Sequence, residues 1–175
     1  MSQIDLLRDK LPEAAKDLRL NLQTVLRPEN LTSDQVWGVA LASVYFIGHA
    51  ELRDAVLADA TAAGIPEAVI DDAKASASIM GMNTVYYRFR HLVEKPSYAT
   101  MPARLRMMRM GQPQTDKVSF ELMSMACAAL AGCGMCITAH EATLTQHGVS
   151  EAAVHDSVRI AAVLQGAAVA LGIVA

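Results

Sequence analysis

The feature that most limits the possible folds is an internal repeat. When the chain is shifted by 84 residues without a gap, a series of positions between 42 and 77 meets identical residues in the second half. The matched pairs are Ala42/Ala126, Gly48/Gly132, Ala55/Ala139, Ala58/Ala142, Gly64/Gly148, Glu67/Glu151, Ala68/Ala152, Asp72/Asp156 and Ala77/Ala161. The high alanine content explains some of these matches, but both glycine pairs fall at equivalent expected helix breaks. We therefore expect two copies of one unit, approximately residues 35–83 and 119–167, in a single domain of residues 1–175.

Each unit is expected to be helical. Ala, Leu and Met, all strong helix formers, dominate the chain, and alternating β-branched runs are absent. Thr32 and Gln35 have the spacing of a capping box, and Asp116 and Ser150 are N-cap candidates. Residues 94–104, which contain two prolines, are predicted to be a loop. The sequence therefore predicts an all-α fold.

The composition narrows the function classes. With 53% hydrophobic and 19% charged residues the chain is not disordered, and its net charge of −3 gives no reason to expect a nucleic-acid partner. Residues 1–5 become charged at once, so no secretory signal is visible. The apolar stretch 160–175 is interrupted by Gln165 and is shorter than the ~20 residues of a membrane span, which predicts a buried or subunit-contact helix. Three cysteines are too few for a disulfide framework, so we expect a cytoplasmic protein whose cysteines are reactive, metal-binding or packed.

The two copies differ in their chemistry. The second copy carries a polar, reactive set of side chains where the first copy presents mostly apolar groups, and packing needs alone would not predict that difference. The equivalent pairs are Trp37/Glu121, His49/Cys133, Leu52/Cys136 and Val56/His140. The reactive site is therefore expected in the second copy.

Cys133 stands at an expected helix boundary, because Gly132 and Gly134 flank it. Free N–H groups and the dipole at a helix N-terminus stabilise a thiolate and lower its pKa, and we expect the flanking glycines to leave this sulfur exposed. Cys136 follows one turn later on the same face, close enough to close a small disulfide loop, and His140 follows Cys136 at i+4. An imidazole there can take the thiol proton and then stabilise the thiolate.

Glu121 precedes Cys133 by twelve residues on an otherwise apolar helix. A hairpin at Gly132 sets Glu121 ~18 Å along one arm and His140 ~10 Å along the other. The difference of ~8 Å is within reach of two side chains with a water between them. A buried carboxylate near a histidine holds its tautomer and raises its basicity, which is the orienting role in a catalytic triad.

Other interpretations of these residues stay open. Cys133, Cys136 and His140 supply three zinc ligands, although no second CxxC or HxxxH is present to complete a structural site. The two cysteines could instead be an inert core pair, and Glu121 an ordinary surface charge.

Three further features have simpler expected roles. Cys127, in mid-helix among alanines, is predicted to be a packed core thiol, and His49 a satisfied core histidine. Several arginines crowd around the proline-rich loop, and we favour a solvated rim over a contact with an acidic partner domain. They are Arg88, Arg90, Arg104, Arg106 and Arg109.

The pattern of Glu121, eleven residues, Cys133-x-x-Cys136, three residues and His140 resembles the alkyl hydroperoxide reductase D family, within the carboxymuconolactone decarboxylase-like superfamily. Gly81-Met82-Asn83 and Leu11-Pro12-Glu13 are also similar to this family, and the resemblance covers essentially the whole chain. It implies an all-α homotrimer that reduces organic hydroperoxides or disulfides as an antioxidant. It also implies that the electron donor is a dihydrolipoyl group, such as dihydrolipoamide on a lipoyl-bearing protein. The implied partner is a two-cysteine peroxiredoxin, and no bound cofactor or metal is implied.

Carried over residue by residue, the resemblance implies that Cys136 is oxidised to sulfenic acid and forms the mixed disulfide with the peroxiredoxin. Cys133 would be the resolving cysteine and proton donor, closing the Cys133–Cys136 disulfide, with Glu121 and His140 in the proton relay. The family commonly has a second histidine between the cysteines, where this chain has Met135, so we expect a lower peroxidase efficiency or a shifted pH optimum. Two rivals remain: a decarboxylase or lactone-processing enzyme on the same fold, which needs neither cysteine, and a zinc-stabilised interaction module.

Overall fold

The computed structural model describes residues 1–27 and 29–173 and confirms the all-α prediction, because these residues form no strand. Pro28, Val174 and Ala175 lie outside the described residues, so the last two positions of the expected domain and of its apolar C-terminal stretch do as well. One 3₁₀ turn, Glu13–Ala15, accompanies the helices. These are α1 (Gln3–Lys10), α2 (Lys16–Val25), α3 (Ser33–Ile47), α4 (Ala50–Ala62), α5 (Glu67–Leu92), α6 (Pro96–Thr100), α7 (Met108–Gly111), α8 (Lys117–Ala131), α9 (Gly134–Gln146) and α10 (Glu151–Ile173).

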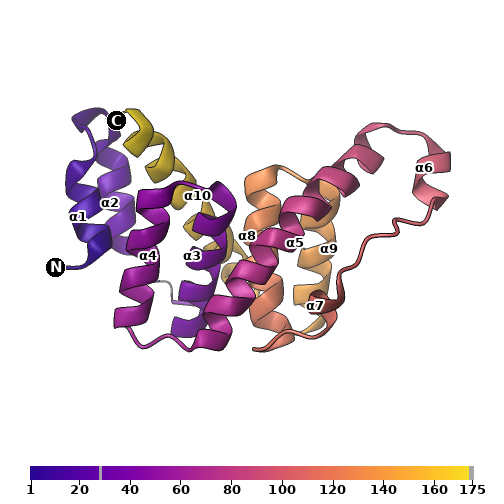
Figure 1. The fold of residues 1–175 in the computed structure, drawn as a ribbon, viewed down its shortest axis with the longest axis horizontal. Helices are drawn as coiled ribbons and strands as arrows, with labels where there is room; N and C mark the ends of the chain where they lie inside the picture. The colour runs from indigo at the N-terminus through magenta and orange to yellow at the C-terminus, as the bar shows by residue number, and fades with distance from the viewer. Residues whose placement is uncertain (28, 174–175) are drawn as a thin grey trace.

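Two helices, α3 and α8, form the centre of the molecule, and α5 and α10 each pack against both of them (Figure 1). On one side, α4 packs against α3 and α1, and α2 packs against α10. On the other side, α9 packs against α8 and α5. The helix that carries the CxxC segment therefore lies at the opposite end from α1 and α2.

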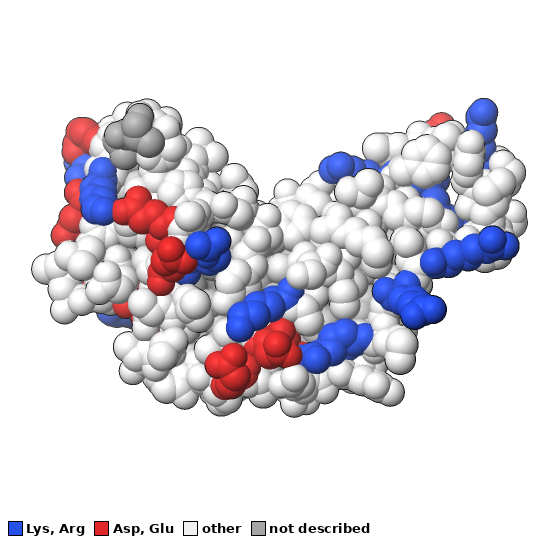
Figure 2. Space-filling model, in the orientation of Figure 1, with Lys and Arg blue, Asp and Glu red and all other residues white. Residues whose placement is uncertain are grey.

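The C-terminal end of α5 extends beyond its neighbours and, with α6 and the following linker, forms an arm (residues 85–107) that projects from the body (Figure 1). The segment 94–104, predicted as a loop, therefore contains the short helix α6. Figure 2 shows Lys and Arg gathered at this end, and the arm contains five basic residues and one acidic residue. It also exposes large apolar side chains, namely Val85, Phe89, Leu92 and Met101. The arm surface is thus both basic and apolar.

The helix bounds of the two halves coincide after a shift of 84 residues. The bounds of α3 and α4 fall on those of α8 and α9, and α5 and α10 begin at the equivalent Glu67 and Glu151. Both central helices end at a glycine in the left-handed conformation, Gly48 with φ 79° and Gly132 with φ 64°. This conformation carries no steric penalty for glycine because it lacks a Cβ. Two copies of one unit would produce this agreement.

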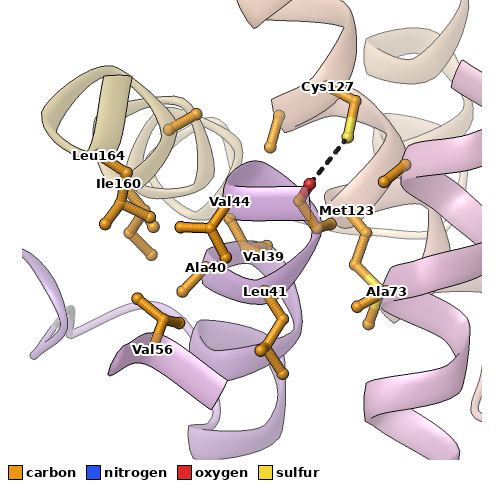
Figure 3. Packing of buried hydrophobic residues seen from close by; sticks show 14 of the residues in the cluster. Val39, Ala40, Leu41, Val44, Val56, Ala73, Met123, Cys127, Ile160 and Leu164 are labelled. Carbon is orange, nitrogen blue, oxygen red and sulfur yellow. Dashed lines mark hydrogen bonds between the residues drawn. The ribbon is translucent and has the colours of Figure 1, made fainter. Parts of the chain in front are cut away.

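Buried apolar side chains from both halves of the chain fill the space around the central pair, and Figure 3 shows part of this core. Val44 on α3 faces Leu164 on α10, and Met123 reaches from α8 toward Ala73 on α5. Gly38 on α3 leaves room for the end of the Met123 side chain. The two copies therefore share one continuous core.

Local start signals set the helix ends. Thr32 and Gln35 form the predicted capping box, and Asp116 caps α8 by accepting the N–H of Ser119 at 2.9 Å. Ser150 accepts the N–H of Ala153 at 3.2 Å. Each such cap is worth about 1 kcal/mol. The Asp116 cap thereby fixes where α8, the helix that carries Glu121, begins.

The C-terminal helix is the one described helix that is long and apolar enough to cross a membrane by length and composition. Half of its apolar window is buried inside the fold, where α10 packs against α2, α3 and α8. A core helix of a folded domain has this burial.

Candidate active site

The CxxC segment begins a helix. α8 ends at Ala131, Gly132 turns the chain, and Cys133 is the N-cap of α9. Its Sγ accepts the N–H of Cys136 at 3.4 Å, and a disulfide bond joins the two cysteines, whose Cα atoms lie 5.3 Å apart. Cys133 therefore caps the helix and also takes part in the disulfide.

The two cysteines are covered by the fold. Cys133 is 0% exposed and Cys136 is 6% exposed, so the prediction that flanking glycines expose Cys133 is wrong. Gly134 and Met135 are exposed, whereas the inner side of α9 packs against α8 and α5. The glycines remove side chains on the outer side only, and the helices on the inner side bury the sulfur. Cys136 is therefore the more accessible of the two cysteines.

Glu121 and His140 meet directly. Nδ1 of His140 lies 2.6 Å from Oε2 of Glu121, and both residues are buried. No water is needed between them, because α8 and α9 pack against each other along the hairpin. An ionised carboxylate can only accept hydrogen bonds, so Nδ1 donates its N–H and the neutral imidazole keeps a free lone pair on Nε2. The burial also excludes Glu121 as a surface charge.

Lys117 completes this cluster, and no sequence pattern singled it out. Its Nζ lies 2.6 Å from Oε1 of Glu121 and donates to the backbone oxygen of Met110 at 3.2 Å. Burial raises the pKa of Glu121, but hydrogen bonds from His140 and Lys117 outweigh burial and hold this pKa below its usual value. The sequence signal for this contact is the i,i+4 spacing of Lys117 and Glu121, but that spacing is common on exposed helix faces and does not by itself indicate a buried site.

The arginines near the proline-rich loop have separate roles. Arg109 on α7 pairs with Asp71 at 2.6 Å and with Asp72 at 2.8 Å, which fixes α7 to α5. Arg88 donates to the backbone oxygen of Ala131 at 2.7 Å, at the end of α8 beside the CxxC segment. Arg88 and the other three all lie on the arm. Two of the five arginines that were predicted to form a solvated rim, Arg88 and Arg109, therefore make contacts that hold the fold together.

The equivalent positions of the first copy are structural. His49 is partly exposed and caps α4, because its Nδ1 accepts the N–H of Leu52 at 3.3 Å. Its prediction as a core histidine is therefore wrong. Leu52 and Val56 are fully buried and carry no polar group. This end of the fold holds no counterpart of the reactive pair.

Cys127 is the predicted core thiol. It is fully buried in α8, its Sγ donates to the backbone oxygen of Ala42 at 3.7 Å, and burial raises its pKa to about 12. It stays protonated and inert at neutral pH. Among the residues that the structure describes, no group of three or more His, Cys, Asp or Glu side chains is arranged to hold a metal ion.

Comparison with known proteins identifies relatives that match nearly the whole chain. Residues 96–175 match the model of the carboxymuconolactone decarboxylase family. A protein of Anaeromyxobacter sp. (strain Fw109-5), named alkyl hydroperoxide reductase AhpD, is 52% identical over 171 residues, which cover 98% of this chain and 92% of the relative. A protein of Brucella suis with the same name is 49% identical over 168 residues, which cover 96% of this chain and 95% of the relative. The chain therefore belongs to the AhpD family, within the carboxymuconolactone decarboxylase-like proteins.

Proposed function

We propose that this chain is an antioxidant enzyme of the alkyl hydroperoxide reductase type, a peroxidase that works through a dithiol. The observation that carries the proposal is the buried Glu121–His140 pair, with His140 one turn after Cys136 on α9. A carboxylate-oriented imidazole beside a dithiol is the arrangement that ionises a thiol near neutral pH. The relatives' name, alkyl hydroperoxide reductase, supports the same class of reaction.

In the reduced enzyme, Nε2 of His140 takes the proton of the Cys136 thiol. The thiolate attacks the peroxide, the O–O bond breaks, and Cys136 becomes a sulfenic acid while the alkoxide takes the proton of Cys133 and leaves as an alcohol. The Cys133 thiolate then attacks the Cys136 sulfur, and the released hydroxide takes the proton from His140 to form water. One dithiol and one hydroperoxide thus give one disulfide, one alcohol and one water.

Two physical arguments bear on which sulfur reacts first. The N-cap position favours a low pKa at Cys133, because the helix dipole stabilises its thiolate. Cys136 is the more exposed of the two cysteines and has His140 one turn away. A buried thiolate that the peroxide cannot reach does not react, so we assign the attack to Cys136 and the resolving step to Cys133.

The same dithiol is proposed to reduce the disulfide of a two-cysteine peroxiredoxin, with the mixed disulfide at Cys136. Dihydrolipoyl groups on a lipoyl-bearing protein would then restore the dithiol by two exchange steps and become lipoyl disulfides. A reducing dithiol suits the cytoplasm, where thiols are kept reduced. The exposed apolar side chains of the arm, Phe89 and Leu92 among them, support a closed oligomer, for which we propose a homotrimer.

The test is peroxide-dependent oxidation of dihydrolipoamide, measured with and without a two-cysteine peroxiredoxin. Cys133→Ser should consume about one equivalent of peroxide and leave a sulfenate on Cys136 that a trapping reagent labels for mass spectrometry. Cys136→Ser should consume almost none. If Cys136→Ser instead consumed peroxide as fast as the wild type and carried a trapped sulfenate on Cys133, the assignment of the two sulfurs would be reversed. A doubly substituted Cys133→Ser/Cys136→Ser protein with full activity on a lactone or carboxylate substrate would favour the rival activity named in the family description.

A further inference from the structure

Lys117 lies between solvent and the buried Glu121–His140 pair. It is the first residue of α8, one turn before Glu121. Its Nζ and the imidazole Nδ1 divide the carboxylate between them, since Nζ contacts Oε1 at 2.6 Å and Nδ1 contacts Oε2 at 2.6 Å. The three side chains are 40%, 4% and 9% exposed in the order Lys117, Glu121, His140. The cation is thus the member of the cluster that faces water.

The position of Lys117 is fixed by α7. The backbone oxygen of Met110 on α7 accepts a hydrogen bond from Nζ at 3.2 Å. The segment that joins α7 to α8 is held to α5, because Asp72 accepts the backbone N–H of Gln114 at 3.1 Å and of Thr115 at 2.8 Å. The ammonium group is therefore anchored at two acceptors, unlike a freely mobile surface lysine.

We propose that Lys117 is a positioning residue of the redox site: its ammonium keeps Glu121 ionised and holds the carboxylate so that Nδ1 of His140 carries the proton and Nε2 remains free to accept one from Cys136. The inference rests on the proposed function for its catalytic consequence. Its electrostatic part, the effect of Lys117 on Glu121, stands on the two contacts alone.

The physical reason lies in the tautomer of the histidine. A protonated Glu121 donates its O–H to Nδ1, which leaves the proton of the neutral imidazole on Nε2. His140 is then unable to accept the proton of the Cys136 thiol. Since Glu121 is buried, desolvation favours this neutral form, and the nearby cation opposes it. Lys117 thereby extends the working range of the relay to lower pH.

The charged surroundings of Glu121 are simple. His140 faces it from α9 and Lys117 from its own helix, and these are the groups that lower its pKa. Just before α8, Asp72 of α5 accepts the backbone N–H groups of Gln114 and Thr115, and this carboxylate pairs with Arg109 of α7 at 2.8 Å. Within the described ranges, α3, α5, α7 and α10 place no oppositely charged group within 4.0 Å of the Glu121 carboxylate. Removing Lys117 therefore leaves His140 as the sole partner of this kind.

The experiment titrates Glu121 directly in protein labelled with ¹³C at the glutamate carboxyl carbons, with its resonance assigned by its loss in Glu121→Gln. Lys117→Met should raise the titration midpoint by at least about half a pH unit, and Lys117→Arg should restore most of the difference. In the dihydrolipoamide assay the acid limb of kcat/KM should move upward by the same amount, which is about threefold in rate on that limb. Lys74→Met is the matched control, because Lys74 makes an exposed ion pair with Glu67 at 3.6 Å on α5. Lys74→Met should change neither the titration midpoint of Glu121 nor the position of the acid limb of kcat/KM.

Several results would overturn the proposal. A Glu121 midpoint that Lys117→Met leaves in place would do so, as would a uniform loss of rate at every pH without movement of the acid limb. If Lys117→Met does not fold, the wild-type titration still decides, because a Glu121 midpoint at or above that of free glutamate contradicts an ionising role for Lys117. The carboxyl titration does not depend on catalysis. A wild-type protein without peroxidase activity therefore refutes the proposed function and leaves the effect of Lys117 on Glu121 to be read from the spectra.

Discussion

Replacing Glu121 by glutamine changes one atom of the relay and leaves its volume the same. The carboxylate accepts from Lys117 through Oε1 and from His140 through Oε2. An amide has one oxygen for these two donors, and its NH₂ group must face either the ammonium or the imidazole. Facing the ammonium, it would set two donors against each other beside a full charge. The oxygen therefore stays on Lys117 and the NH₂ group turns toward His140.

This orientation fixes the wrong histidine tautomer. Nδ1 must accept from the amide, so the proton of the neutral imidazole moves to Nε2, and the lone pair that we propose accepts the Cys136 proton is lost. Losing an oriented general base typically costs 10²–10⁴ in rate, and an aspartate-to-asparagine change that leaves a triad in the wrong tautomer costs about 10⁴. We expect Glu121→Gln to lose at least ~10-fold in kcat/KM and to approach ~10³-fold if thiol ionisation limits the rate.

The assay is peroxide-dependent dihydrolipoamide oxidation, with circular dichroism to establish that the variant folds. Glu141→Gln is the control, because Glu141 follows His140 on the same helix but accepts from Thr145 at 2.9 Å instead of from the imidazole. It should keep the wild-type rate. Equal rates for Glu121→Gln and the wild type, in proteins of equal stability, would show that the buried pair is structural and that the relay does not exist.

Further predictions concern stability and assembly. Gly132→Ala should lower the free energy of unfolding by about 1 kcal/mol in denaturant titration, because φ is 64° at this residue. A Cβ there meets no atom within 4 Å, so the loss comes from the backbone conformation and not from a clash. Gly134→Ala, where φ is not positive, should not destabilise the fold. Burial raises the pKa of Asp72, but hydrogen bonds from Thr115, Gln114 and Arg109 outweigh burial and lower this pKa. The ionised carboxylate therefore stabilises the fold above about pH 4, and this contribution is lost as the pH falls further. Asp72→Asn should accordingly flatten the acid side of a plot of Tm against pH. Because burial raises the Cys127 pKa to about 12, this thiol should resist a thiol reagent at pH 8 until the reduced protein unfolds. Light scattering at micromolar concentration should show an oligomer, and a monomer would contradict the proposed trimer.

Much of the fold follows from local patterns in the sequence. Glycine at 48 and 132 and an N-cap oxygen at Thr32 and Asp116 are short-range signals, and each helix end occurs where its signal predicts. The arm was not predictable in the same way. Residues 94–104 look like a loop because of their prolines, yet Pro96 occupies a first helical turn, where a missing N–H has no cost.

The candidate site shows where such reasoning stops. The spacing of Glu121 and His140 indicates that they can approach, but straight helices give only a distance along each arm. Direct contact at 2.6 Å depends on how closely α8 and α9 pack. The burial of Cys133 has the same origin, since tertiary neighbours and not its adjacent glycines decide it. The role of Lys117 could not be predicted from the sequence, because it depends on the burial of the Glu121 carboxylate, which only the tertiary structure shows.

The first copy of the unit explains why this chemistry leaves the fold unchanged. His49 and Cys133 occupy equivalent N-caps, and each accepts the N–H of the third residue after it, at 3.3 and 3.4 Å. The cap therefore requires an acceptor and not a particular reactive group, while the proposed chemistry requires sulfur at this position together with Cys136 and His140 one and two turns later. Serine is a stronger helix cap than cysteine, so Cys133→Ser should keep the start of α9, whereas Cys133→Ala should lose about 1 kcal/mol of stability. A fall in turnover without a fall in Tm for Cys133→Ser would thus report the missing sulfur, and a Tm lowered as far as in Cys133→Ala would contradict the capping role.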